Sequence, residues 1–260
     1  MKNLFCILGI CLIITSCTSS LYYQMYQTKA LTNDITVNDD AIVFEDDNCI
    51  ISYDFWGENG DIGFDIYNKN SENLYLHLDE CFFVKNGYAY DYYQNRIYSS
   101  SSTSVLSASI SYTSASFSAA EKRIICIPPQ SSKIVSEYTI NEQPYKDCDI
   151  VFYPGKKDNN TLDFTKENSP FVFGNILAYS IGDSETLNRI YNDFYVSKIS
   201  NYPLDVITTE VPQELCGKQL QYKKERVFKN SGPDQFYIQY NYDYRYDDKP
   251  DNPMYYDRYY

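Results

Sequence analysis

The chain has 260 residues, with 22 lysines and arginines against 35 aspartates and glutamates, a single histidine and eight cysteines. Apolar residues make up 43% of the chain and charged residues 22%, which is typical of a folded globular protein rather than a disordered one. The net charge of -13 argues against a nucleic-acid-binding protein, because contact with the phosphate backbone needs a cationic surface.

Residues 1–16 have the features of a signal peptide. Lys2 precedes an uncharged, apolar run from Leu4 to Ile14, which is too short to cross a bilayer. The run leads into Ile14-Thr15-Ser16-Cys17, which resembles the lipobox of bacterial lipoproteins. The resemblance implies cleavage before Cys17 and acylation of its thiol, which would anchor the protein to a membrane without spanning it. The alternative is an ordinary secretory signal with a chance cysteine.

The residues after the lipobox bear on location. Thr18, rather than an aspartate, follows the cysteine, and in lipoproteins of enteric bacteria this resembles the pattern of outer-membrane proteins. We therefore expect a lipid-anchored protein of the cell envelope, in the outer membrane, with the periplasmic or surface side left open. Residues 17–40 are polar with scattered aromatic side chains, and they are interpreted as a tether that leads into the domain.

Two Asn-Gly pairs, at residues 59–60 and 86–87, predict β-hairpins. Asn-Gly accepts the positive φ angles of a type I′ turn, and the segments on both sides of each pair are rich in β-branched and aromatic residues. The flanking segments are residues 49–57, 61–67, 82–84 and 88–90. Between the two pairs, three leucines at residues 74, 76 and 78 share one face of a further strand. The sequence therefore predicts an antiparallel sheet.

Residues 99–118 interrupt this pattern with 11 serines, two threonines and no charged residue. Such a segment buries little apolar surface to offset the entropy lost on ordering, so we predict a long Ser/Thr-rich loop. An exposed hairpin is the alternative.

Strand patterns continue to the end of the domain. Pro128-Pro129 ends one strand and separates it from the next, because proline donates no backbone hydrogen bond. Strands are predicted at residues 123–127, 134–138, 148–153, 171–181, 194–200, 204–211 and 236–246. This pattern predicts an antiparallel β-sandwich with few helices over residues 41–246, followed by a Tyr-rich tail at 247–260.

Four segments of the chain resemble a family of uncharacterised lipoproteins from gut Bacteroidota. They are Asp54-Phe55-Trp56 to Asn68-Lys69, Leu78 to Phe83, Ile125 to Pro128 and Ser169 to Phe173. The resemblance implies a lipid anchor and an immunoglobulin-like, β-rich body, and it carries no known activity. The C-terminus of this chain is richer in tyrosine than that family would lead us to expect.

Five cysteines remain when the signal peptide and Cys17 are set aside, so at least one thiol stays unpaired. Cys126 and Cys148 are the first pair to test as a disulfide, although spacing alone does not establish it. The cysteines form no Cys-x-x-Cys motif, and the single histidine, His77, projects opposite the three leucines. We therefore expect no metal site and no cofactor.

Signatures of common enzymes are missing from the sequence. There is no Gly-rich phosphate loop and no Gly-x-Ser-x-Gly motif. Carboxylates are abundant, Asp79 and Glu80 among them, and two such groups facing each other across a cleft can hydrolyse glycosidic bonds. A glycan-processing hydrolase therefore stays as an alternative, and no residue is assigned as catalytic.

Tyrosine is the strongest compositional bias, with 29 residues. Tyr240, Tyr242, Tyr244 and Tyr246 alternate with polar residues, which places four rings on one face of an extended strand. Such rings suit the binding of a glycan or an envelope protein, whereas the alternative is an edge strand that covers its own core. We expect a non-catalytic protein that binds or assembles through this surface, with a structural accessory of an outer-membrane complex as a further alternative.

Overall fold

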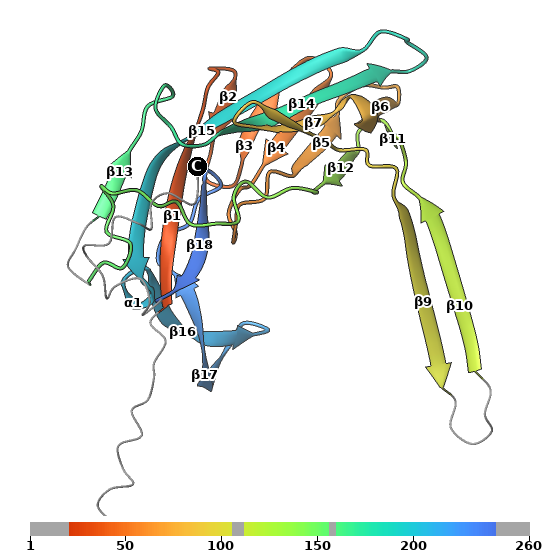
Figure 1. Cartoon of the computed structure of the whole chain (residues 1–260). Helices are drawn as coiled ribbons and strands as arrows, with labels where there is room; N and C mark the ends of the chain where they lie inside the picture. Colours follow the sequence, from red (N-terminus) through yellow and green to blue (C-terminus); the bar gives the residue numbers. More distant parts are fainter. Residues whose placement is uncertain (1–20, 106–111, 156–159, 243–260) are drawn as a thin grey trace, which may run out of the picture.

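The computed structural model describes residues 21–105, 112–155 and 160–242, which form two packed antiparallel sheets and two separate two-stranded hairpins (Figure 1). The larger sheet contains β1 (Leu21–Ala30), β6 (Leu74–His77), β7 (Phe82–Lys85), β8 (Tyr88–Asp91), β11 (Ile124–Ile127), β13 (Asn160–Asp163), β14 (Val172–Ile181), β15 (Asn188–Pro203) and β18 (Gln235–Asn241). The smaller sheet contains β2 (Ile35–Val37), β3 (Ile42–Glu45), β4 (Cys49–Tyr53), β5 (Phe64–Asn68) and β12 (Ser132–Val135). The predicted antiparallel β-sandwich is confirmed.

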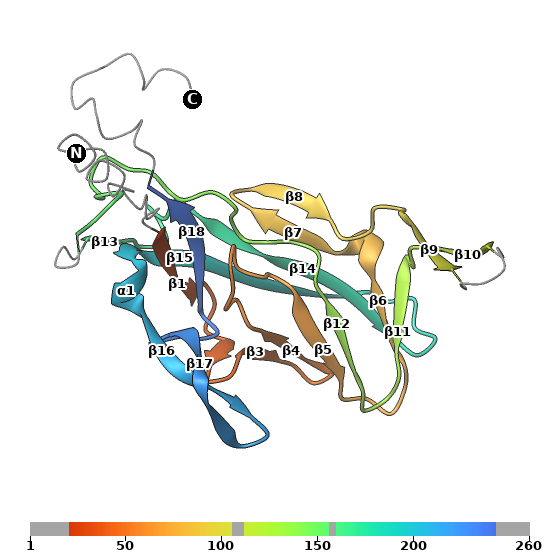
Figure 2. The ribbon, with the colours of Figure 1, turned by 90° about the horizontal axis from the view of Figure 1, so that it is seen from below.

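The 16-residue strand β15 organises the larger sheet, whose main order is β11-β6-β14-β15-β1-β18. The first half of β15 pairs with β14, and its second half pairs with β13 on one edge and β1 on the other. The smaller sheet packs on the part built from β14 and the first half of β15, whereas β1, β18 and the end of β15 extend beyond it (Figure 2).

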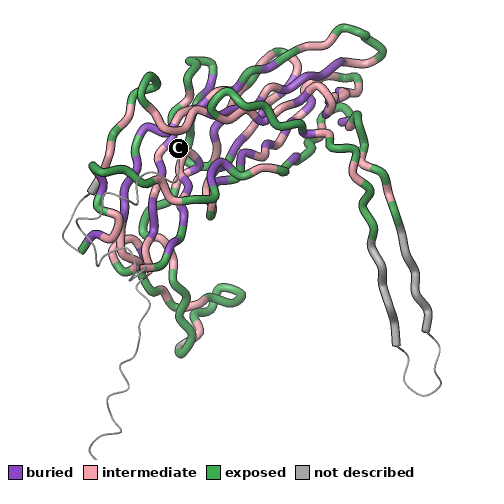
Figure 3. Tube along the Cα trace, viewed as in Figure 1, coloured by how far each residue is buried: buried purple, intermediate pink, exposed green. Residues whose placement is uncertain are grey.

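Aromatic side chains fill the space between the two sheets. Phe194 lies at the centre, with its ring 5.4 Å from that of Tyr53, 5.0 Å from that of Phe55 and 5.8 Å from that of Phe173. The Tyr53 hydroxyl donates a hydrogen bond of 2.9 Å to the Asn192 side-chain oxygen, so this buried polar group is satisfied. Figure 3 shows the resulting band of buried residues along both sheets.

The predicted tether at residues 17–40 is wrong in its described part. Residues 21–30 form β1, which lies between β15 and β18 in the larger sheet, and residues 35–37 form β2. Buried polar groups of β1 are satisfied by partners outside it. The amide of Gln24, which is fully buried, donates to Asn201 at 2.8 Å and accepts from the backbone N–H of Tyr145 at 2.6 Å. Polar composition therefore concealed a central strand.

Both Asn-Gly pairs have the expected positive φ angles, but only one forms a tight hairpin. Asn86-Gly87 joins β7 directly to β8, as predicted. Asn59-Gly60 lies in the longer connection between β4 and β5, where Asn59 donates its backbone N–H to Tyr237 at 2.8 Å. This connection thereby ties the smaller sheet to β18.

The Ser-rich segment is a hairpin in its described part, so the predicted loop at residues 99–118 is corrected to the alternative. β9 (Ile97–Val105) pairs with β10 (Tyr112–Ala120) over nine residues each, and residues 106–111 lie outside the described ranges. The hairpin extends from the body at the end opposite β1 (Figure 1). The loop prediction considered only the small apolar surface of this segment. The two strands instead satisfy each other's backbone N–H and carbonyl groups.

An ion-pair clamp fixes the base of this hairpin. The carboxylate of Glu121, whose side chain is only 5% exposed, contacts the Arg96 guanidinium at 2.6 Å and accepts the backbone N–H groups of Gln94 and Arg96 at 2.9 and 3.0 Å. The other terminal nitrogen of the Arg96 guanidinium, Nη1, contacts the Glu137 carboxylate at 2.6 Å. Hydrogen bonds to ionised groups of this kind are shorter and stronger than neutral ones.

Acid is expected to loosen the clamp. Burial by itself would raise the pKa of Glu121, but the hydrogen bonds from Arg96 and from the two backbone N–H groups outweigh it and lower the pKa. The clamp therefore contributes fully above the unfolded-state pKa of about 4.3, and its contribution is lost as the pH falls through the lower folded-state value. Amide hydrogen exchange at residues 94–98 and 119–121, corrected for intrinsic rates, should accelerate below that pH in the wild type and respond less to pH in Glu121→Gln.

Two later segments also differ from prediction. Residues 148–153 were predicted as a strand but form turns and irregular backbone. Residues 204–211 divide into a four-residue helix, α1 (Leu204–Ile207), and the start of β16 (Thr208–Leu215), which pairs with β17 (Lys218–Phe228). A short 3-10 helix covers Leu78–Glu80. Within the ranges that the structure describes, no helix is long and apolar enough to pass through a bilayer.

Candidate functional site

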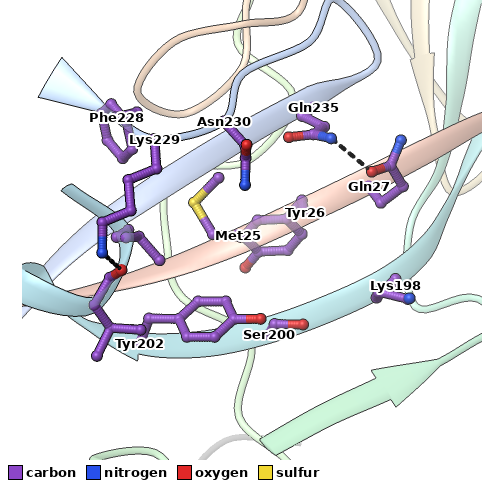
Figure 4. A pocket seen from close by; sticks show the side chains of 12 residues that line it. Met25, Tyr26, Gln27, Lys198, Ser200, Tyr202, Phe228, Lys229, Asn230 and Gln235 are labelled. Atoms are coloured by element: carbon purple, nitrogen blue, oxygen red, sulfur yellow. Dashed lines mark hydrogen bonds between the residues drawn. The ribbon is translucent and has the colours of Figure 1, made fainter. Parts of the chain in front are cut away.

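A groove with a volume of about 360 Å³ lies on the part of the larger sheet that is formed by β1, β15 and β18 (Figure 4). Its floor is formed by β1, β15 and β18, and its wall by α1, the end of β17 and the two residues that follow. We call this cavity the groove; it is lined by Met25, Tyr26, Gln27, Lys198, Ser200, Tyr202, Val206, Ile207, Phe228, Lys229, Asn230 and Gln235.

The register of the three floor strands aligns the polar side chains of the groove in rows. Gln27 of β1 pairs with Lys198 of β15 on one side and with Gln235 of β18 on the other. One step along the sheet, Met25 pairs with Ser200. Because residues two apart on a strand share a face, these side chains all lie on the same side of the sheet.

A chain of hydrogen bonds fixes the orientation of the floor amides. The Gln235 side-chain N–H donates to the Gln27 oxygen at 2.8 Å, and the Gln27 N–H donates to the Asp234 carboxylate at 2.5 Å. Burial raises the pKa of Asp234, although the Gln27 hydrogen bond acts in the opposite direction. The floor therefore presents amides in fixed positions rather than freely rotating ones.

Two lysines stand at the edges of the groove. Lys229 donates its backbone N–H to the Ile207 carbonyl at 2.9 Å, and its ammonium group donates to the Val206 carbonyl. Lys198 lies 3.5 Å from the Asp163 carboxylate and is exposed. Both lysines line the groove, and Lys198 is paired with the exposed Asp163 carboxylate.

An aromatic cluster holds the wall of the groove against the sheet. The Phe228 ring lies 5.0 Å from Trp56, 5.4 Å from Tyr23 and 4.6 Å from Tyr237. These rings come from β17, the β4–β5 connection, β1 and β18, so one contact set joins the β16–β17 hairpin to three other parts of the fold. Pairs of this geometry stabilise beyond their buried area.

The side chains that line the groove are mainly hydrogen-bonding and aromatic groups. Its side chains offer amides, hydroxyls, two ammonium groups and three aromatic rings, and no carboxylate, imidazole or thiol belongs to the described residues that line it. Ser200 contacts the Thr161 hydroxyl at 2.8 Å rather than a base. In the described part of the chain, no group of three or more His, Cys, Asp or Glu side chains is placed to hold a metal ion.

The tyrosine row predicted as a surface is only partly described, and its first member is buried. Tyr240 is 8% exposed, its ring lies 4.5 Å from that of Phe152, and its hydroxyl donates to the Phe152 carbonyl at 2.5 Å. Tyr242 is half-buried, with its ring 4.6 Å from that of Tyr153. Tyr240 thus covers the core of its own fold, which corrects its assignment to a binding surface. Tyr244 and Tyr246 lie outside the described residues.

The cysteines do not form the predicted pair. All five cysteines in the described ranges are free thiols, so Cys126 and Cys148, both exposed, are not joined. Cys126 lies on β11 and Cys148 in the irregular segment that was predicted as a strand, so their sequence spacing did not reflect a shared sheet. Cys81 is buried, and burial raises the pKa of its thiol to about 12. Cys17 lies outside the described residues.

Asp79 and Glu80, which are among the carboxylates considered for hydrolysis, form ion pairs. Asp79 contacts Arg123 at 2.6 Å, and Glu80 contacts Arg189 at 2.8 Å. His77 lies 3.1 Å from the Ser180 hydroxyl on the neighbouring strand. The three side chains therefore contact these neighbours rather than one another.

None of the groove residues was singled out from the sequence. They come from five elements between residues 25 and 235, and no motif links them. Comparison of the chain with protein-family models, with curated proteins and with solved structures finds no match.

Proposed function

We propose that this protein is a non-catalytic binding protein of the cell envelope, held to the membrane by a lipid on Cys17, and that the groove takes a short glycan segment. The lipobox at residues 14–17 and the similarity to lipoproteins of gut Bacteroidota support the anchor and the outer-membrane location. One observation carries the choice of ligand: the oriented amides of Gln27 and Gln235 lie in one groove with Tyr202 and two lysines.

Glycans match this set of side chains. Their hydroxyls pair with amides and hydroxyls, and their apolar ring faces pack on aromatic and aliphatic side chains such as Tyr202 and Met25. Lys198 and Lys229 at the edge would favour acidic sugars among them. The absence of a carboxylate or imidazole from the described lining favours binding over hydrolysis.

The test is titration calorimetry of the purified protein with neutral oligosaccharides and with oligosaccharides that contain uronic acid. Asn230→Trp should fill the groove from an exposed position and weaken binding at least about tenfold, which corresponds to about 1.4 kcal/mol. Gln219→Trp is the matched control, because Gln219 is equally exposed but lies outside the groove.

Two results would contradict the proposal. If both tryptophan variants bind like the wild type, the ligand does not occupy the groove. If mass spectrometry detects cleaved oligosaccharide, and Asn230→Trp abolishes the cleavage, the protein is an enzyme and the hydrolase alternative replaces the binding one.

A further inference from the structure

The β16–β17 hairpin differs in charge from the rest of the protein. Residues 208–229 contain five basic residues, Lys218, Lys223, Lys224, Arg226 and Lys229, against three acidic ones, Glu210, Glu214 and Glu225. The chain as a whole has the opposite balance, with 22 basic residues against 35 acidic ones. Most residues of this hairpin are exposed to solvent (Figure 3). Packing within the fold therefore does not explain why positive charges are concentrated there.

β17 carries basic and apolar residues close together. Lys224 and Arg226, which pair with Pro212 and Glu210 of β16, share one face of the hairpin, because residues two apart on a strand point the same way. The register shift between Gln219 and Lys224 separates Lys218, which pairs with Leu215, from this alternation. Glu210 lies 3.5 Å from Lys224 and 3.4 Å from Arg226, so one carboxylate is shared between two cations. The face keeps a net positive charge.

Two large apolar side chains of the hairpin are exposed to solvent. Tyr222 is 95% exposed and Leu215, at the turn, is 63% exposed. Neither contributes to the core, whereas Phe228 at the base of the same hairpin packs into the aromatic cluster described above. Tyrosine beside basic residues is the composition of segments that lie at the interface between membrane and water.

The position of the hairpin connects it to the proposed anchor. Cys17 precedes Leu21, the first residue of β1, by four residues, which span at most about 14 Å. The start of β1 pairs with the end of β15, and α1 leads from there into β16. Figures 1 and 2 both place the hairpin at this end of the body. An acylated Cys17 would therefore hold the hairpin close to the bilayer.

We propose that the β16–β17 hairpin is a second membrane contact, which lies on the anionic surface of the bilayer that holds the lipid on Cys17. This inference rests on the proposed lipid anchor. The lipid on Cys17 would hold the hairpin near the bilayer, and a basic segment held there is attracted by anionic lipids. Each basic residue near an anionic surface strengthens binding about fivefold. The groove, whose wall is the base of this hairpin, would then face ligands at the membrane surface.

The experiment measures flotation of the full chain with vesicles of phosphatidylcholine alone, and with vesicles in which a third of the lipid is phosphatidylglycerol. We expect tighter binding to the anionic vesicles, with the difference lost at high salt. The triple variant Lys218→Gln, Lys224→Gln, Arg226→Gln should lose at least about tenfold in binding to anionic vesicles. Tyr222→Ser should weaken binding to them by a smaller factor. The control Lys122→Gln, Lys133→Gln removes two exposed lysines outside the hairpin and should change binding less than about twofold.

Cys17→Ala in the full chain separates the two proposals. If the wild type binds phosphatidylcholine vesicles and Cys17→Ala does not, the anchor is supported. Equal binding to phosphatidylcholine by both contradicts the anchor alone. The hairpin contact is supported if Cys17→Ala binds anionic vesicles but not phosphatidylcholine vesicles, and if adding the triple substitution to Cys17→Ala abolishes that binding. Equal binding of Cys17→Ala to both kinds of vesicle, or an equal loss in the lysine control, overturns the hairpin contact. Thermal melting of each variant shows whether it is folded.

Discussion

Replacing Phe194 with alanine is expected to lower the free energy of unfolding by about 4 kcal/mol. The Phe194 ring is 1% exposed and contacts three other rings, one of them in the opposite strand β4, so its removal leaves a void that both sheets line. A domain of this size loses about 2–4 °C in melting temperature per kcal/mol, so Phe194→Ala should melt about 10 °C or more below the wild type.

Tyr191→Ala is the control for Phe194→Ala. Tyr191 lies three residues earlier on β15 and is 54% exposed, so its truncation should change the unfolding free energy by no more than about 0.5 kcal/mol. Equal melting temperatures for the two variants would show that the sheets do not pack through Phe194, and the sandwich described above would then be wrong.

The sandwich could be predicted where each strand has one apolar face. Leu74 and Leu76 are fully buried on the face that alternation assigned to the core, and Asn86-Gly87 makes the predicted turn. In these segments the local sequence pattern and the tertiary contacts favour the same structure, so the strands can be predicted from a single sequence.

Strands whose buried face carries polar side chains could not be recognised in this way. β1 reads as a polar tether because its interior positions hold Gln24 and Tyr26, whose polar atoms are satisfied by distant residues such as Tyr145. Hydropathy does not reveal a buried amide whose partners lie over a hundred residues away. The hairpin of β9 and β10 posed a related problem, because the prediction from composition did not consider backbone pairing between the two strands.

The groove was unpredictable for a topological reason. Gln27 and Gln235 are separated by 208 residues and meet only because the last described strand pairs with the first. The basic residues between 218 and 229 stand together in the sequence, but only the overall charge of -13 entered the predictions. The structure adds that these residues lie on an exposed hairpin beside the start of β1.

Gly174→Ala is expected to destabilise the protein by about 3 kcal/mol through overpacking rather than through loss of contacts. A Cβ atom at Gly174 on β14 would lie 2.2 Å from the Asn192 carbonyl oxygen and 2.9 Å from the Asp193 Cα on β15. Both are backbone atoms, so no side-chain rotation relieves the clash and the two central strands must separate. That movement would also disturb Phe194, the next residue on β15.

Gly57→Ala provides the matched control, because a Cβ atom there meets no other atom within 4 Å. Gly57 lies in the β4–β5 connection without a positive φ, so alanine should be neutral or slightly stabilising, within about 0.5 kcal/mol. Urea denaturation of both variants gives the comparison, with unchanged slopes showing that only stability has moved. If Gly174→Ala unfolds at the same urea concentration as Gly57→Ala, the close approach of β14 and β15 is not present in solution.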